Sequence, residues 1–115
     1  MIGRMGIFVG FLGLMLLNNP QGFADDTPDV SGIYKKNCAM CHKADGKGIS
    51  VMKTPDFTNK DWQTRHTDEQ LIAVITKGSD HGTIKMPAFG EGTKANLSPG
   101  TIKALVTEVI RKFTE

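Results

Sequence analysis

Apolar residues recur at helical spacing near the C-terminus of the chain. They are Ile102, Leu105, Val106, Val109, Ile110 and Phe113. This i, i+3, i+4, i+7 spacing predicts an amphipathic helix with one wide buried face. Ser98 is a favourable N-cap and Pro99 suits the first helical position, so we expect the helix to begin there. The charged residues between the apolar positions are expected to face water: Lys103, Glu108, Arg111 and Lys112.

Two shorter helices are predicted by their ends as well as by their periodicity. In the first, Thr27 is expected as N-cap and Pro28 at the first helical position, and the helix leads into the cysteine motif described below. In the second, Thr67 and Gln70 have the spacing of a capping box, and Gly78 supplies a stop. One face of this second helix is apolar and consists of Leu71, Val74 and Ile75.

The first 24 residues have the pattern of a secretory signal peptide. Arg4 provides a positive charge, residues 5–17 form an uncharged and mostly apolar run, and residues 22–24 have the small-x-small pattern of a cleavage site. The run is shorter than the about 20 apolar residues that a membrane span needs. We therefore expect export to the periplasm with cleavage after Ala24, leaving residues 25–115 as one domain. An uncleaved N-terminal membrane anchor is the alternative.

Residues 38–42, Cys-Ala-Met-Cys-His, have the C-x-x-C-H pattern of covalent c-type haem attachment. Two cysteines three positions apart lie on one face of a helical turn, where each thiol can form a thioether with one vinyl group of the porphyrin. His42 follows directly, so its imidazole is aimed at the iron as the proximal ligand. The other ring nitrogen of His42 needs a hydrogen-bond acceptor, expected among the backbone carbonyls of residues 51–57. We predict one haem c and its iron, held by Cys38, Cys41 and His42.

Three other uses of the cysteine pair compete with haem attachment. The thiols could form a disulfide, bind zinc or act as a redox C-x-x-C. Zinc needs further ligands, yet the chain has only two cysteines, and the remaining histidines, His66 and His81, are fifteen residues apart. A redox site of the thioredoxin type needs a βαβ context, which the sequence does not offer. Haem attachment also agrees with export, because bacteria attach haem c outside the cytoplasmic membrane.

A second iron ligand is predicted in the M-P-A-F sequence that begins at Met86. A thioether sulfur suits low-spin iron, and a His/Met pair raises the reduction potential relative to two nitrogen ligands. After signal removal the only other methionines are Met40, between the cysteines, and Met52, close to the proximal side. A loop after the second helix can instead carry Met86 to the distal face. His81 is the alternative distal ligand.

Five further side chains are expected to pack against the porphyrin: Tyr34, Trp62, Leu71, Ile75 and Phe89. Trp62 can lie against the ring and donate its N–H to a propionate, or it can be a core residue without haem contact. A domain of this size buries little surface and often needs a metal or cofactor. We therefore expect haem to complete the core and the haem-free chain to be largely unfolded.

Together these residues resemble the class I cytochromes c, of the small bacterial monohaem type. The resemblance consists of Tyr34 four residues before Cys38, and of the segments CAMCH, TDEQLIAVITKG, KMPAFG and LSPGTIKALVTEVI. It covers essentially the whole mature chain, and C-x-x-C-H followed by M-P-A-F is its specific part. The family implies an all-α cytochrome c fold, with three to five short helices wrapped around one covalent haem and crossed terminal helices. By position, Cys38 and Cys41 hold the haem, His42 is the proximal ligand and Met86 the distal one.

Two features depart from the family pattern. Many members have glycine eight residues before the first cysteine, which lets the terminal helices touch closely. Here that position is Val30, and Gly32 follows two residues later. Many members also carry an aromatic residue midway along the final helix, whereas here the only aromatic of that segment, Phe113, comes near its end. The helix crossing is therefore expected to be wider or to use different contacts.

An iron atom with both axial positions filled by protein has no open site for a substrate or gas. The leading hypothesis is therefore a non-enzymatic electron carrier that passes single electrons between respiratory redox partners. One alternative is a haem enzyme or gas sensor, such as a small peroxidase, in which Met86 is displaceable. Another is an electron-transfer subunit of a larger oxidase or dehydrogenase.

The expected partners are redox proteins, whether an oxidase, a reductase or a dehydrogenase, and the protein is expected to be a monomer without a membrane span after cleavage. Without Arg4, basic residues exceed acidic ones by a single charge, which gives no case for nucleic-acid binding. Four lysines near the predicted haem loops form a candidate docking patch: Lys43, Lys47, Lys85 and Lys94. Scattered solvated lysines are the simpler explanation.

Overall fold

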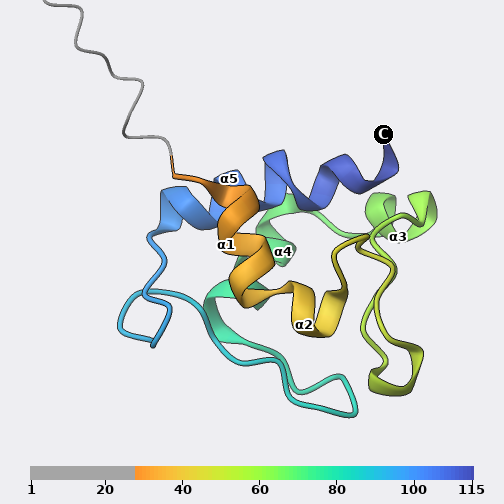
Figure 1. The fold of residues 1–115 in the computed structure, drawn as a ribbon, viewed down its shortest axis with the longest axis horizontal. Helices are drawn as coiled ribbons and strands as arrows, with labels where there is room; N and C mark the ends of the chain where they lie inside the picture. Colours follow the sequence, from red (N-terminus) through yellow and green to blue (C-terminus); the bar gives the residue numbers. More distant parts are fainter. Residues whose placement is uncertain (1–27) are drawn as a thin grey trace, which may run out of the picture.

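The structure, a computed structural model, describes residues 28–115, which are helical and contain no β-strand (Figure 1). The α-helices are α1 (Val30–Asn37), α2 (Ala39–His42), α3 (Lys60–Arg65), α4 (Asp68–Lys77) and α5 (Pro99–Glu108). Two short 3₁₀-helices are η1 (Ser50–Met52) and η2 (Ile110–Thr114). The prediction of an all-α fold is confirmed. The signal peptide predicted for residues 1–24 and the N-cap predicted at Thr27 lie outside the described residues.

The core is built around α5, which packs against both α1 and α4 (Figure 1). Ile102, Leu105 and Val106 of α5 are fully buried. Burying each such side chain contributes about 1.5–3 kcal/mol. The other buried apolar residues of the core are Val30, Tyr34, Phe57, Leu71, Ile75 and Ile110. Within residues 28–115, no helix combines the length and apolar character needed to cross a membrane.

Local signals place most helix ends where the sequence predicts them. Thr67 and Gln70 form the predicted capping box of α4, with Gln70 N–H donating to Thr67 Oγ1 at 3.1 Å and Thr67 N–H donating to Gln70 Oε1 at 2.9 Å. Ser98 caps α5 by accepting from the Thr101 N–H at 3.2 Å. At α1 the predicted start is wrong by two residues, because the carboxylate of Asp29 is the N-cap, accepting from the Gly32 N–H at 3.0 Å.

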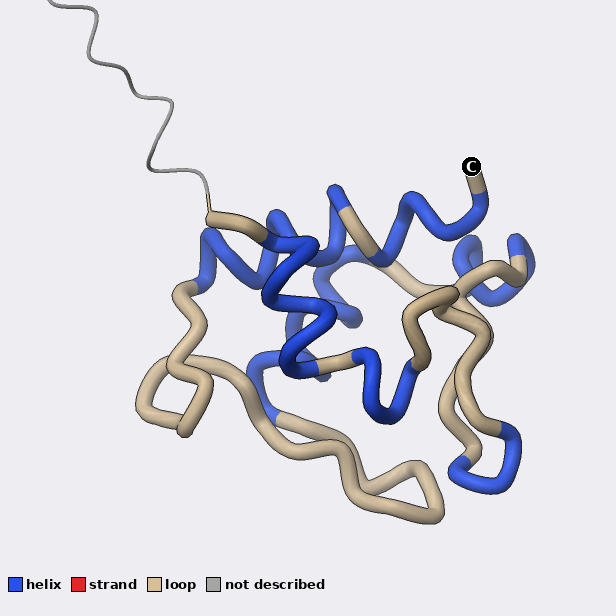
Figure 2. The backbone as a smooth tube through the Cα atoms, viewed as in Figure 1, coloured by secondary structure: helices blue, strands red, loops and turns tan. Residues whose placement is uncertain are grey.

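The C-terminal segment is not the single helix that its apolar spacing predicts. The α-helix ends at Val109 (φ −120°, ψ −63°), and η2 follows as a separate piece (Figure 2). A 3₁₀-helix has three residues per turn instead of 3.6, so it changes which side chains face inward. The prediction that Arg111 faces water is therefore wrong, since its side chain is only 24% exposed.

The crossing of α1 and α5 is made by aliphatic side chains, whereas the aromatic contacts are made by η2. Val30 is buried in the same core cluster as Leu105. At Gly32 the atoms nearest to an added Cβ belong to the Asp29 carboxylate, which caps the same helix. Phe113 packs with its ring centroid 5.4 Å from that of Tyr34 and 5.9 Å from that of Phe57. The expectation of different contacts at this crossing therefore agrees with the structure.

Candidate functional site

A cavity of about 990 Å³ lies in the described part of the chain, lined by α1, α2 and α4 and by the segments around residues 52–57 and 79–97. This volume is at the upper end of the about 300–1,000 Å³ of ligand pockets. Every site residue predicted from the sequence lines it: Tyr34, Cys38, Cys41, His42, Trp62, Leu71, Ile75, Met86 and Phe89. The fold therefore brings together the cysteine motif and a methionine more than forty residues away.

The cysteine motif is presented by the junction between α1 and α2. Cys38 lies between the two helices, and its carbonyl accepts from the N–H groups of Cys41 at 3.2 Å and His42 at 2.9 Å. Both cysteines are free thiols rather than a disulfide. Burial, with a smaller effect from Cys41, raises the pKa of the Cys38 thiol to about 11. A free Cys38 is therefore a neutral thiol at neutral pH.

His42 ends α2, and its ring stacks on Phe57 with centroids 4.8 Å apart and planes 18° apart. Burial lowers the pKa of His42, which favours the neutral imidazole that binds metal ions. Its Nδ1 atom is buried and has no hydrogen-bond partner among the described residues. The predicted bond to a backbone carbonyl of residues 51–57 is therefore absent from the structure, and the imidazole is instead in contact with the Phe57 ring.

Tyr34 fixes the backbone that follows His42. Its hydroxyl donates to the Lys43 carbonyl at 2.7 Å, and burial raises its pKa. A packing role against porphyrin was expected for Tyr34, but this hydrogen bond was not, because it joins residues nine positions apart across a turn. Tyr34 thus contributes both to the cavity wall and to the geometry of the motif.

Met86 is held next to the C-terminal end of α4. Ser79 and Met86 exchange two backbone hydrogen bonds, of 3.0 Å from the Ser79 N–H and 2.9 Å from the Met86 N–H. Gly78 has φ +81°, and a Cβ atom there would lie 2.5 Å from the Met86 carbonyl oxygen, so only glycine fits. The rival ligand His81 lies within this closed loop and also lines the cavity, whereas Met40 is 86% exposed.

Trp62 lines the cavity and also packs against two other rings that line it, those of His66 and Phe57. Its ring stacks on His66 at 4.5 Å between centroids and is tilted against Phe57 at 5.1 Å. His66 Nδ1 lies 2.7 Å from the Trp62 carbonyl oxygen. The two alternatives for Trp62, a cavity contact and a packing residue, are therefore not exclusive.

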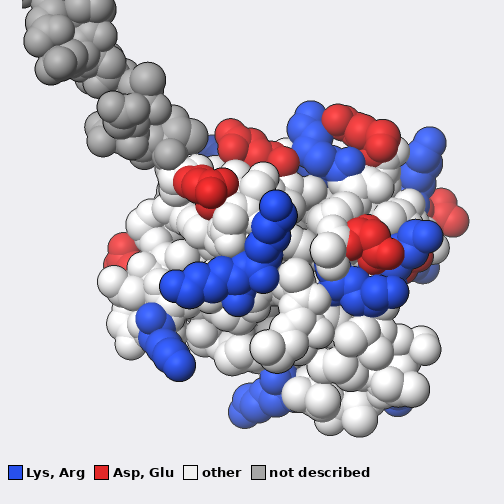
Figure 3. Space-filling model, viewed as in Figure 1, with Lys and Arg blue, Asp and Glu red and all other residues white. Residues whose placement is uncertain are grey.

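The charged side chains that line the cavity are all basic: Lys36, Lys53, Lys85 and Lys94. In the space-filling view, the lower part of the displayed face carries Lys and Arg groups but no carboxylates (Figure 3). Lys85 pairs with Asp80 at 3.1 Å, and both side chains are largely exposed, so the pair contributes little to stability. Lys43 and Lys47 of the predicted docking patch do not line the cavity, whereas Lys36 and Lys53 were missed.

The residues present fit a covalently bound haem. Two thiols, a partly buried imidazole and a thioether meet in one mainly apolar cavity. This is the donor set of a c-type haem with His/Met ligation. The buried, unpartnered Nδ1 of His42 is consistent with an imidazole that uses its other nitrogen to bind a metal. Among the described residues, no group of three or more His, Cys, Asp or Glu side chains offers a competing metal site.

Comparisons with known proteins agree with this fit. A family model described as cytochrome C oxidase, cbb3-type, subunit III, matches residues 25–107. The cbb3-type cytochrome c oxidase subunit FixP of Bradyrhizobium diazoefficiens is 35% identical over 77 residues, which cover 67% of this chain and 24% of that protein. Cytochrome c6 of Aphanizomenon flos-aquae is 33% identical over 70 residues, covering 61% of this chain and 76% of that protein.

Among solved structures, the KustC0563 c-type cytochrome is similar with a TM-score of 0.63 and 30% identity, covering 76% of this chain and all of that one. The chain spans about a quarter of the length of the curated oxidase subunits that it matches. The similarity to these longer subunits therefore concerns one of their parts, whereas the similarity to the small cytochromes covers most of their length.

Proposed function

Since this chain belongs to the cytochrome c family of the cbb3-type oxidase subunit III, we propose that it is a periplasmic carrier of single electrons with His42 and Met86 as iron ligands. As a member of this family it is an electron-transfer cytochrome with one covalently bound haem c. The haem supplies one-electron exchange between ferric and ferrous iron. The observation that carries the proposal is that His42, Met86 and both cysteines line one cavity.

The residues of the chain have separate roles in this proposal. Cys38 and Cys41 tether the porphyrin and His42 binds the iron from the same turn of helix. Met86 is the second ligand, and its backbone bonds to Ser79 hold it in place. Apolar residues of α4 and of the segment after Met86 exclude water from the iron, which favours the less charged ferrous state.

A non-enzymatic role follows from the two protein ligands. If His42 and Met86 both bind the iron, a peroxide or a gas would find no open site on the metal. The second function we consider is an electron-transfer subunit of a larger oxidase or dehydrogenase. The name of the FixP relative, an oxidase subunit, favours this candidate.

Optical spectroscopy of the haem-loaded protein tests the ligand set. The ferric protein should show the weak far-red band of sulfur-bound haem, and the ferrous protein should resist carbon monoxide. Met86→Leu should abolish the band and bind carbon monoxide rapidly. Met52→Leu is the matched control, because Met52 also lines the cavity. His81→Gln should likewise leave the spectrum unchanged, and loss of the band in that variant instead of Met86→Leu would contradict the proposal.

The basic rim of the cavity supports docking of acidic redox proteins. Met40 and Ile84, which are 86% and 58% exposed, lie in the same lining as the four lysines. An apolar contact with a predominantly basic surround suits a transient complex, in which the charges steer encounter. We include this docking surface, Met40 and Ile84 with Lys36, Lys53, Lys85 and Lys94, in the proposal.

Charge reversal tests the docking surface. Oxidation of the ferrous protein by the hexacyanoferrate(III) anion should slow as ionic strength rises, because salt screens the attraction. The double variant Lys53→Glu with Lys94→Glu should weaken or reverse this salt dependence. Lys60→Glu with Lys103→Glu is the control, since both are exposed residues outside the cavity lining. Equal salt dependence in the two double variants would rule out this surface.

A further inference from the structure

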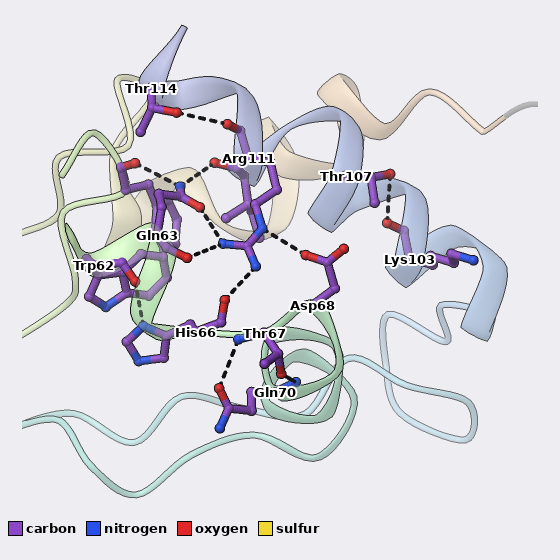
Figure 4. A network of polar contacts seen from close by, with 12 residues as sticks. Trp62, Gln63, His66, Thr67, Asp68, Gln70, Lys103, Thr107, Arg111 and Thr114 are labelled. Carbon is purple, nitrogen blue, oxygen red and sulfur yellow. Dashed lines mark hydrogen bonds and ion pairs between the residues drawn. The ribbon is translucent and has the colours of Figure 1, made fainter. Parts of the chain in front are cut away.

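Gln63 of α3 is a buried polar residue, 8% exposed, with every polar atom of its side chain engaged (Figure 4). Its Nε2 donates to the Phe57 carbonyl at 2.9 Å and to the Ile110 carbonyl at 2.8 Å. Its Oε1 accepts from Arg111 Nη1 at 2.7 Å. Because a buried amide without partners is costly, these three bonds fix the orientation of the side chain.

Arg111, a residue of η2, bonds to Gln63 and to the start of α4 (Figure 4). Its Nη1 also donates to the Gln63 carbonyl at 2.7 Å, and its Nη2 donates to the His66 carbonyl at 2.6 Å. Its Nε donates to Asp68 Oδ1 at 2.8 Å. The planar guanidinium thus joins the C-terminal segment to α3 and to the start of α4, a geometry that lysine cannot reproduce.

Phe57 connects this network to the proximal side of the site. Its N–H donates to the Gly46 carbonyl at 2.8 Å and its carbonyl accepts from Gln63, so both of its backbone polar groups are held. Its side chain is 5% exposed and stacks on the His42 imidazole. Since His42 Nδ1 has no hydrogen-bond acceptor among residues 28–115, this stacking is the described contact that can set the plane of the ring.

We propose that Gln63 and Arg111 are positioning residues for His42, acting through the Phe57 ring. The proposal rests on the proposed role of His42 as proximal ligand. Groups that orient a ligand and control access of water to it tune the metal almost as strongly as the ligands do. The sequence of contacts runs from Arg111 to Gln63, from Gln63 to Phe57, and from Phe57 to His42.

The first test replaces Gln63 with Glu in the haem-loaded protein. A carboxylate still accepts from Arg111 but cannot donate to the Phe57 carbonyl, so the constraint on Phe57 is lost. We expect a lower reduction potential, because water that reaches His42 Nδ1 makes the imidazole a stronger donor to ferric iron. We also expect shifted haem-methyl resonances in the ferric protein, since these report the plane of the imidazole.

Two further variants separate positioning from simple stability. Arg111→Met should reproduce both changes, and Phe57→Leu should reproduce them without touching the polar network. Arg65→Met is the matched control, because Arg65 is an exposed residue of the same helix as Gln63. It should leave the potential and the resonances unchanged.

The outcome that overturns the proposal is a Gln63→Glu protein that unfolds at lower denaturant concentration but keeps the potential and the haem-methyl resonances of the unmodified protein. If Gln63→Glu does not fold, the same comparison is made with Arg111→Lys and Phe57→Leu, and unchanged resonances in both overturn it. A wrong assignment of the iron ligands would be visible separately, in the optical spectrum of the unmodified protein.

Discussion

Lys43, the residue directly after the proposed proximal ligand, has a backbone conformation that is largely restricted to glycine. Its φ is 64° and its ψ is 156°. Such a conformation costs of order 1–3 kcal/mol in a residue with a side chain. Two hydrogen bonds hold it: the Lys43 N–H donates to the Ala39 carbonyl at 2.8 Å, and its carbonyl accepts from Tyr34. The strain lies where the chain must turn sharply away from the site.

Replacing Lys43 with Gly should therefore stabilise the haem-loaded protein by about 1 kcal/mol, because the relief of strain exceeds the added flexibility of the unfolded chain. Denaturant unfolding measures the change. Lys53→Gly is the control, because Lys53 is in the ordinary left-handed region (φ 56°, ψ 30°) and should gain less. An unchanged or lower stability of Lys43→Gly would show that this conformation stores no strain.

Asp56 makes a pH-dependent contribution to the stability of the folded protein. Its carboxylate accepts from the Thr58 hydroxyl at 2.6 Å and from the Thr58 N–H at 2.9 Å, and these bonds lower its pKa. The folded protein therefore binds this proton less readily than the unfolded chain, so the contribution is present above about pH 4 and is lost as pH falls through the folded pKa. Thr58→Val should flatten this acid limb in denaturant titrations, whereas Thr64→Val should not.

At the scale of single elements, α4 connects the two sides of the site. Its first turn carries the capping box and Asp68, which binds Arg111, and its last turn precedes Gly78 and the loop of Met86. One face of the helix contributes Leu71 and Ile75 to the cavity. The stability of this one helix therefore affects the packing around the cavity and the placement of Met86, the proposed distal ligand.

Thr67→Ala removes the side-chain half of the capping box and should destabilise the protein by about 1 kcal/mol. Unfolding of the haem-loaded protein by guanidinium chloride measures the loss. Thr107→Ala is the control, because Thr107 lies within α5 and its hydroxyl donates to carbonyls of its own helix, those of Lys103 at 3.1 Å and Ala104 at 3.5 Å. That substitution should be close to neutral, and equal losses in both variants would argue against a capping contribution.

In the whole molecule, the hydrophobic core and the wall of the cavity share residues. Tyr34, Phe57, Leu71 and Ile75 are core residues that also line the cavity. Without a bound group, the apolar faces that these residues turn toward the cavity stay in contact with water and lose the stabilisation of about 25 cal/mol per Å² that burial provides. Haem bound in the cavity would bury these faces, so we expect haem to be a structural as well as a functional component.

The double variant Cys38→Ala with Cys41→Ala, produced without haem attachment, should accordingly be largely unfolded. Far-ultraviolet circular dichroism should show little helix, and its thermal melt should lack a cooperative transition. The unmodified haem-loaded protein is the reference. A cooperative melt with native helix content in the haem-free variant would show that the polypeptide alone supplies the stability.

Several features of this protein are determined by residues that are near neighbours in the sequence. The cysteine motif depends on five consecutive residues, and the capping box of α4 on four. Helix ends and amphipathic faces follow from such short spacings because their hydrogen bonds and neighbouring side chains are local. The all-α fold and the helix around Leu105 could therefore be predicted, as could nine of the residues that line the cavity. The role of Met86 as iron ligand stays a prediction.

Only the tertiary structure decided the remaining features, because they depend on contacts between distant residues. Arg111 and Gln63 are 48 positions apart, and no local pattern indicates that their side chains meet or that the last helix breaks at Val109 to let them do so. The stacking of Phe57 on His42, and the presence of Lys36 and Lys53 at the cavity in place of Lys43 and Lys47, have the same origin. The spacing of residues along the chain determines which side chains share one face of a helix. The packing between distant segments determines which other side chains that face contacts.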